Sequence, residues 1–164
     1  MATISQHTPA QPLWFLDDLA YVHVDGERTA EAFSLVELVG RRGDMPPVHV
    51  DHRNDETVYV VAGAMTLFVG DREIALREGQ AAVAPRGAQH AYRVESERAR
   101  WLVISSPAGF ERFLRAASDP APSDELPPSG RPGDPDAVVQ LAAEYGIEVI
   151  SPPGTLPDSI AAQS

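Results

Sequence analysis

Short apolar segments recur from about residue 19 to residue 106, and turn residues separate them. They include LAYVHV before Asp25-Gly26, AFSLVELV before Gly40, TVYVVA before Gly63, MTLFV before Gly70-Asp71 and AAVA before Pro85. Segments of this length that are rich in Val, Leu, Phe and Tyr are typical of β-strands. Many short strands at near-regular spacing indicate an antiparallel sandwich or barrel, so we expect an all-β fold built around a small antiparallel β-barrel.

The character of the chain changes after Ser106, where ten of its fifteen prolines fall. The pair Ser106-Pro107 is typical of an N-cap followed by the first residue of a helix, and Asp134-Pro135 repeats the pattern. The first predicted helix carries an apolar stripe of Phe110, Phe113, Leu114 and Ala117. The second carries Val138, Leu141, Ala142 and Tyr145, and ends at Gly146.

These stripes must pack against something, and two arrangements are open. The helices cover the outside of the barrel, which we favour, or one of them forms a lid over its mouth. The linker of residues 118–134 is rich in proline, so we expect a mobile or extended surface segment. We therefore divide the chain into a flexible arm (1–12), a β-barrel (13–106) and a helical, proline-rich C-terminal extension (107–164).

Charge and composition exclude several classes of function. The net charge is -11, and no cluster of cationic side chains is present to hold phosphate groups, so we expect no nucleic-acid partner. All 13 cationic residues are arginine and the chain has no cysteine. Schiff-base catalysis by lysine, a cysteine nucleophile, disulfides and thiolate metal ligands are thereby excluded. No apolar run is long enough for a membrane span and the first residues lack a secretion signal, so we expect a cytoplasmic protein without a membrane partner.

Residues 43–63, GDMPPVHVDHRNDETVYVVAG, concentrate side chains that bind metals. In a strand, His49 and Asp51 point to the same side, about 7 Å apart at the backbone. Glu56 can face the same interior if the residues between form a turn or bulge. In GQAAVAPRGAQHAYRV, Pro85 and Gly87 predict a turn that leads into a strand beginning near His90. These four side chains are the candidate ligands of one metal ion.

The spacing of both blocks resembles the paired motifs of the cupin superfamily. The first block places His49, Asp51 and Glu56 between Gly43 and Gly63, and the second places Pro85, Gly87 and His90 after Gly79. The resemblance covers roughly residues 30–106, and PPVHVDHRNDETVYVVAG with the helical tail is similar to single-domain cupins related to flavonol (quercetin) dioxygenases. It implies a small antiparallel barrel, commonly dimeric, with a metal held inside by three histidines and one glutamate.

Two residues depart from the family pattern. Asp51 stands where the second histidine is expected, and Val94 replaces an asparagine that commonly closes the second motif. A carboxylate in place of imidazole favours harder ions such as iron(II), manganese or zinc. By resemblance, the metal ligands are His49, Glu56 and His90, then Asp51. His52 is a reserve ligand that strand alternation directs away.

Other polar and aromatic residues receive no functional role. His7 and His23 are interpreted as surface or core histidines. The arginines at positions 41, 42, 53 and 86 are interpreted as solvated. We expect five large side chains to pack the core: Trp14, Phe15, Phe33, Met65 and Phe68.

A buried ion with these ligands keeps open positions for chemistry. Alternation along the strands predicts that mostly apolar side chains surround the ion: Val58, Val60, Ala62, Tyr92 and Val94. The resemblance implies a metal-dependent dioxygenase acting on an aromatic or enolic small molecule, flavonoid- or polyketide-like, with one divalent ion (Fe, Mn, Ni, Zn or Cu) and Glu56 as both ligand and catalytic base. Two alternatives stay open: a metal-dependent isomerase or cyclase, and a non-catalytic, small-molecule-binding cupin. We also expect a homodimer.

Overall fold

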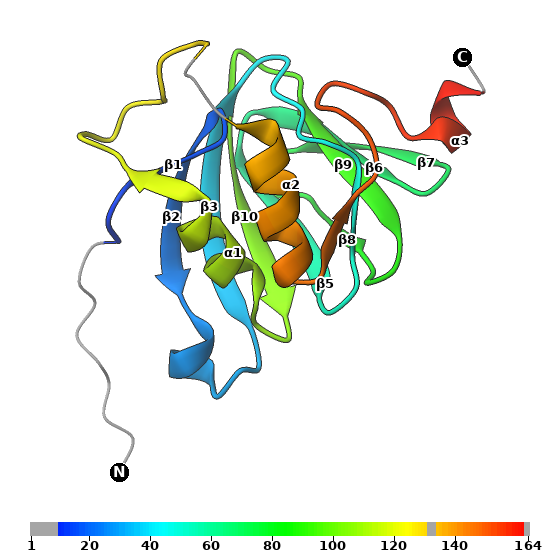
Figure 1. The fold of residues 1–164 in the computed structure, drawn as a ribbon. Coiled ribbons are helices and arrows are strands. Elements are labelled where there is room, and N and C mark those ends of the chain that lie inside the picture. Colours follow the sequence, from blue (N-terminus) through cyan, green and yellow to red (C-terminus); the bar gives the residue numbers. More distant parts are fainter. Residues whose placement is uncertain (1–9, 131–133, 163–164) are drawn as a thin grey trace.

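The chain folds into two antiparallel sheets that face each other, with helices packed at one side (Figure 1). The structure is a computed structural model and describes residues 10–130 and 134–162. The larger sheet has seven strands in the order β11 (Ser118–Pro120), β1 (Leu13–Phe15), β2 (Asp18–Val24), β3 (Ser34–Arg41), β10 (Arg98–Ser106), β5 (Asp55–Ala62) and β8 (Ala81–Ala84).

The smaller sheet has five strands in the order β12 (Ile147–Val149), β4 (His49–Asp51), β9 (Gln89–Val94), β6 (Ala64–Val69) and β7 (Arg72–Arg77). A 3-10 helix, η1 (Gly26–Thr29), links β2 to β3. The predicted all-β class with C-terminal helices is confirmed, in the form of a jelly-roll sandwich of two separate sheets rather than a closed barrel.

Alternation along the strands places the core between the sheets. In β5, Val58 and Val60 are buried whereas Tyr59 is 39% exposed. Trp101 of β10 pairs with Leu38 of β3, and both are buried in the same cluster as Met65 and Leu67 of the smaller sheet. A hydrogen bond from the Tyr92 hydroxyl of β9 to the Asp18 carboxyl of β2 crosses the sandwich inside this core. The two sheets are therefore joined by apolar packing and by buried polar contacts such as this one.

Helices α1 (Phe110–Ala116) and α2 (Pro135–Glu144) pack on the core and not on the outer face of the sandwich. The Phe15 ring contacts the rings of Phe110 and Phe113 edge-on, at 6.0 and 5.7 Å between centroids. Phe113, Leu114 and Ala142 belong to the cluster of buried residues between the sheets. The predicted apolar stripes are confirmed, but the expectation that the helices cover the outside is wrong, because the inner face of the large sheet extends beyond the small one (Figure 1).

Helix α2 begins where the sequence predicts, whereas α1 does not. Asp134 caps α2, its side chain accepting from the Ala137 N–H, and Pro135 is the first helical residue, as predicted. Helix α1 instead begins at Phe110 with Gly109 as N-cap. Ser106 is the last residue of β10, where it pairs with Asp55, and its peptide bond to Pro107 is cis. Strand pairing therefore overrides the capping signal.

The C-terminal extension contributes strands to both sheets. β11 pairs with β1 at one edge of the large sheet, and β12 pairs with β4 at one edge of the small sheet. A short helix, α3 (Asp158–Ala161), ends the described chain. Residues 118–130 of the linker contact the large sheet: the backbone oxygens of Glu125 and Pro127 accept bonds from Trp14 and Arg41. Residues 131–133 of the linker and 1–9 of the predicted arm, with His7, lie outside the described residues.

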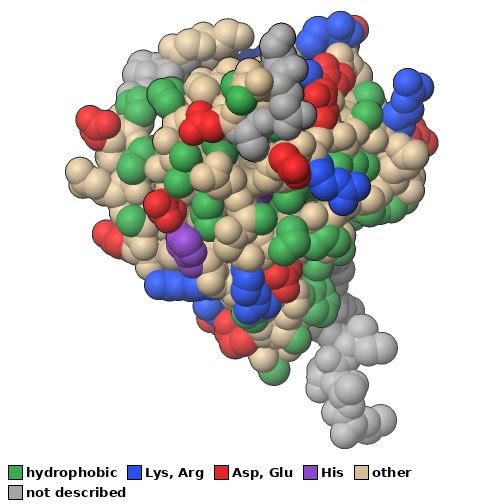
Figure 2. Space-filling model, turned by 90° about the vertical axis from the view of Figure 1, so that its right-hand side faces the viewer, with side chains coloured by type: hydrophobic (Ala, Val, Ile, Leu, Met, Phe, Trp, Pro, Cys, Tyr) green, Lys and Arg blue, Asp and Glu red, His purple; other side chains and the backbone are tan. Residues whose placement is uncertain are grey.

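Surface chemistry is mixed on the face that the small sheet presents. Figure 2 shows acidic, arginine and hydrophobic side chains interspersed there, without a basic stripe.

Of the predicted core aromatics, Phe15 and Phe68 are buried, but Phe33 is 40% exposed, which corrects its assignment. Among the described residues, no helix is long and apolar enough to cross a membrane.

Candidate metal centre

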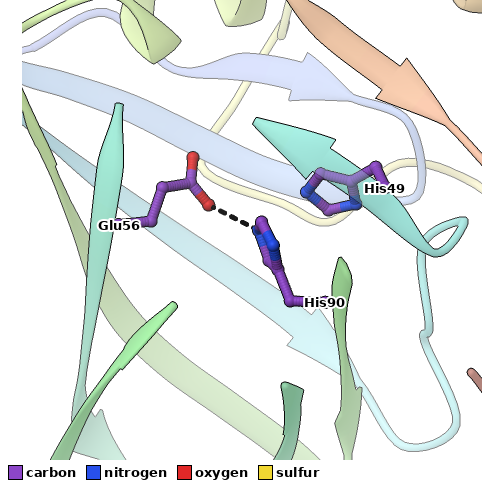
Figure 3. A group of neighbouring side chains, drawn as sticks. All are labelled: His49, Glu56 and His90. Atoms are coloured by element: carbon purple, nitrogen blue, oxygen red, sulfur yellow. Dashed lines mark hydrogen bonds and ion pairs between the residues drawn. The ribbon is translucent and has the colours of Figure 1, made fainter. Parts of the chain in front are cut away.

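Three of the predicted ligands meet between the two sheets. His49 of β4 and His90 of β9 are directly opposite each other in the small sheet. Glu56 comes from β5 of the large sheet, where it pairs with Ala84 and Ser105. One ligand atom from each of the three residues lies within 4.8 Å of the other two, and Figure 3 shows the side chains converging. We call this group the His-His-Glu trio.

The backbone fixes both imidazole rings of the trio. The Nδ1 of His49 lies 2.8 Å from the Pro47 carbonyl oxygen, and the Nδ1 of His90 lies 3.0 Å from that of Ala88. A ring whose Nδ1–H donates to a carbonyl keeps Nε2 for a ligand, which is the usual arrangement at protein metal sites. The His90 Nε2 lies 3.2 Å from the Glu56 carboxylate.

Burial and mutual charge shift the pKa of every member of the trio. Burial, with the nearby charge of His90, lowers the pKa of His49 to about 4. Burial opposes charge on Glu56, but the hydrogen bond and charge of His90 outweigh it, so the pKa of Glu56 is lowered. Burial likewise opposes charge on His90, yet the bond to Glu56 raises its pKa. The contact between Glu56 and His90 thus favours the charged form of both groups, whereas burial favours a neutral His49.

Tight turns hold the loops that carry the trio. Gly87 has a positive φ of 80° in the turn before β9, and its N–H donates to the Asp51 carbonyl oxygen. Arg86 in the same turn makes a two-pronged ion pair with Asp55, the residue before Glu56. These contacts join the two sequence motifs directly and set the trio's spacing.

Asp51 lies outside the trio, although it is 1% exposed. Its Oδ1 accepts the backbone N–H groups of Arg53 and Asn54 at 2.8 and 2.9 Å, which closes the turn between β4 and β5. Its Oδ2 is buried and has no hydrogen-bond partner among the described residues. Burial, together with the negative charge of Glu56, raises the pKa of the Asp51 carboxyl. Asp51 as a direct ligand remains a prediction.

The reserve ligand points away, as strand alternation predicts. His52 is exposed, and its Nε2 lies 2.8 Å from the carboxylate of Glu148 in β12. His23 lies on the outer face of the large sheet, paired with Glu37. That outer face carries a hollow of about 570 Å³ lined by Tyr21, His23 and Glu37, and no member of the trio lines it.

Most of the apolar residues that were expected around the trio are buried. Val58, Val60 and Val94 are buried as strand phase predicts, and the Tyr92 ring packs against Trp101 at 4.9 Å between centroids. The expectation for Ala62 is wrong, because it is exposed. The pairing of β10 with β5 shifts register next to Ala62, and such a bulge reverses which side the following residue faces.

Sequence reasoning missed that the C-terminal extension borders the centre. β12 pairs with β4 so that Val149 is opposite His49 and Ile147 is opposite Asp51. Cross-strand partners share a face, so both apolar side chains lie on the side of the trio. The only signal was the apolar alternation in the short segment IEV after Gly146.

The trio suits a divalent transition metal. Two imidazoles and one carboxylate are ligands that iron, manganese, nickel, copper and zinc accept, and a bound ion would take the place of the contact between His90 Nε2 and Glu56. Asp51 Oδ2, which has no hydrogen-bond partner among the described residues, is a further acceptor on the same side of β4 as His49. These residues therefore fit the metal that the sequence motifs imply.

Comparison with known proteins agrees with this geometry. Residues 37–105 match the family described as Cupin domain. The chain is 26% identical over 136 residues to quercetin 2,3-dioxygenase of Bacillus subtilis, which covers 83% of this chain and 40% of that protein. The chain thus spans less than half the length of that relative.

Two solved structures share the fold. KdgF from a Halomonas species has a TM-score of 0.53 at 21% identity, over 58% of this chain and 84% of that one. The polyketide cyclase RemF from Streptomyces resistomycificus has a TM-score of 0.52 at 23% identity, over 65% and 80%. At these identities the likeness concerns the fold.

Proposed function

Because residues 37–105 form a cupin domain, we propose that this chain is a metal-dependent dioxygenase acting on an aromatic or enolic small molecule, flavonoid- or polyketide-like. The observation that carries the proposal is the similarity to a quercetin 2,3-dioxygenase over 83% of the chain, a stretch that includes the whole trio. His49, Glu56 and His90 are the proposed ligands of one divalent ion: Fe, Mn, Ni, Zn or Cu.

A bound ion would act as a Lewis acid on a substrate oxygen and keep positions open for dioxygen. The protein supplies the rest. The carbonyls of Pro47 and Ala88 hold the two imidazoles in orientation. Burial of Glu56 and His90, 7% and 3% exposed, keeps bulk water from the reacting atoms.

Glu56 is the proposed catalytic base as well as a ligand. Its carboxylate lies 3.2 Å from the Nε2 of His90, so it is placed to exchange a proton at the centre. A substrate hydroxyl that approaches the ion would pass its proton to Glu56, because a general base must lie within hydrogen-bond reach of the proton it accepts. Substrate binding as the anion follows from that transfer.

The surroundings favour an apolar or aromatic substrate. Val58 is buried two residues after Glu56 in β5, and Val149 of the C-terminal extension is opposite His49. Apolar walls with a few polar groups are typical of small-molecule sites.

We also propose a homodimer that forms through the outer face of the large sheet. On this face Tyr59 and Val83 are 39% and 50% exposed, and Leu102 and Ile104 are partly exposed beside them in register. An exposed group of large apolar side chains commonly marks an interface between proteins. A cytoplasmic location and the lack of a nucleic-acid partner stay predictions from the sequence.

Oxygen uptake with quercetin as the probe tests the activity. Protein loaded separately with iron, manganese, nickel, copper or zinc should consume oxygen with at least one ion, and Glu56→Gln should lose this activity. Anaerobic conversion of the probe by metal-loaded protein would favour an isomerase or cyclase instead. Binding of the probe by a protein that takes up no metal would indicate a non-catalytic cupin.

A further inference from the structure

We infer that Asp51 is the second carboxylate of the metal centre, with its Oδ2 compensating the charge of a cation held by the trio while its Oδ1 maintains the turn. The inference rests on the proposed function, since it concerns the same ion. It assigns a role to Asp51 Oδ2, a buried carboxylate oxygen that has no hydrogen-bond partner among the described residues. The role differs from that of an imidazole at this position.

The two oxygens of Asp51 have different surroundings. Oδ1 accepts two backbone N–H groups, from Arg53 and Asn54, so the carboxyl group cannot rotate freely without opening the turn. Oδ2 has no partner among the described residues and has no access to water, because Asp51 is only 1% exposed. A buried carboxylate oxygen without a partner is costly, and proteins ordinarily pair such groups.

The partner that we assign to Asp51 Oδ2 is a cation bound by the trio. Asp51 follows His49 by two residues on β4, so both side chains lie on the same side of the strand. On the adjoining strand, Ile147 of β12 is opposite Asp51 and offers no polar group. His49 is directly opposite His90 of β9, so the trio lies on this side of β4. A divalent ion held by the trio would therefore lie on the side of β4 to which the Asp51 side chain points.

With Asp51 included, the metal centre has a lower net charge than one made of three imidazoles and one carboxylate. Two carboxylates and two neutral imidazoles around a divalent ion add up to neutrality, whereas three imidazoles and one carboxylate leave one positive charge. A second carboxylate close to the ion strengthens binding of harder divalent ions. We therefore expect Asp51 to raise the affinity of the trio for Mn²⁺ without replacing any of its three ligands.

Asp51→Asn separates this role from a structural one. The asparagine oxygen can keep both hydrogen bonds of the turn, while the charge of Oδ2 is removed. We expect Mn²⁺ binding, measured by calorimetry, to weaken by about 10- to 100-fold, as is typical for residues that support metal ligands. The thermal midpoint of the metal-free protein should not fall. Asp51→Ser, which keeps one acceptor for the turn, provides a second variant should the first fail to fold.

The controls distinguish the two proposals. If wild type binds Mn²⁺ and His90→Ala does not, but both Asp51 variants bind like wild type, the role of Asp51 is overturned and the proposed centre stands. If wild type itself binds neither Mn²⁺ nor Zn²⁺, the metal centre fails together with the inference. Equal loss of folding and of affinity in both Asp51 variants would mean that the residue only supports the turn.

Discussion

The His90 Nε2 lies 3.2 Å from a carboxylate oxygen of Glu56, although the two residues belong to different sheets. β9 carries His90 in the small sheet, and β5 carries Glu56 in the large one. The candidate centre therefore exists only when the two sheets are docked. A ligand that binds the folded state alone stabilises it, so metal binding and folding should be coupled.

Metal should raise the stability of this protein through that coupling. At a free ion concentration about 100 times Kd, the free energy of unfolding should rise by about 2.7 kcal/mol. Urea unfolding of wild type with Mn²⁺ or Zn²⁺, against a chelator, measures the gain. His52→Ala is the matched histidine control and should respond like wild type, because His52 is exposed and pairs with Glu148. An identical gain in His90→Ala would place the ion elsewhere.

Asp18 should make stability depend on pH. Burial raises the pKa of its carboxyl from 3.8 to about 8, against the hydrogen bond from Tyr92, which lowers it. Because the folded-state pKa is the higher one, the folded protein holds a proton that the unfolded chain has lost. The contribution of Asp18 to stability is thus complete below about pH 4, lost progressively as pH rises toward 8, and constant above that.

Comparison with Asp18→Asn isolates this effect. The difference in unfolding free energy between wild type and the variant should shift in favour of the variant by a few kcal/mol between pH 4 and 8, since one pKa unit corresponds to about 1.4 kcal/mol. Urea titrations at several pH values provide the measurement. A difference that does not change with pH would show that the Asp18 carboxyl titrates normally in the folded protein.

Phe113 should be essential to the packing of the C-terminal extension. It is 5% exposed, and its ring contacts Phe15 at 5.7 Å and Tyr145 at 6.0 Å between centroids. Phe113→Ala should lower the free energy of unfolding by about 3 to 5 kcal/mol, because the truncation leaves a cavity. Phe33→Ala is the control at an exposed phenylalanine and should cost far less. Equal losses in the two variants would mean that the extension is not part of the folding unit.

The outer face of the large sheet should control oligomeric state. A charge introduced there, as in Tyr59→Asp or Val83→Asp, would be buried in the proposed dimer and should produce monomers in sedimentation experiments at micromolar concentration. Val139→Asp on α2, at a position that is 40% exposed and outside this face, should leave the dimer intact. Wild type that sediments as a monomer would refute the dimer.

Much of the sandwich can be predicted from residue patterns, because its longer strands have clear apolar alternation and glycine turns. The same pattern is too short to recognise in β11 and β12, whose three residues each depend on pairing with β1 and β4 far away in the sequence. Ala62 shows a second limit, since a bulge changes the phase of β5 without a local signal. The position of α1 follows from the unequal sizes of the sheets, which alternation within a strand does not reveal.

The candidate centre could be predicted in part, because turns determine where its three residues lie in the fold. Gly87 and its turn place His90 opposite His49, and the turn after Asp51 brings Glu56 to the same interior. The use of Asp51 Oδ1 as a turn acceptor could not be foreseen, because a carboxylate two residues from a histidine suits a metal or a turn equally well. Only the folded arrangement shows which oxygen stays unpaired.

The central claim is that His49, Glu56 and His90 hold one metal ion, and elemental analysis of the purified, reconstituted protein tests it most directly. Wild type, His90→Ala and His52→Ala should be measured side by side for iron, manganese, nickel, copper and zinc per chain. We predict close to one ion per chain in wild type and His52→Ala, and its loss in His90→Ala. Substoichiometric metal that is the same in all three proteins would contradict the claim.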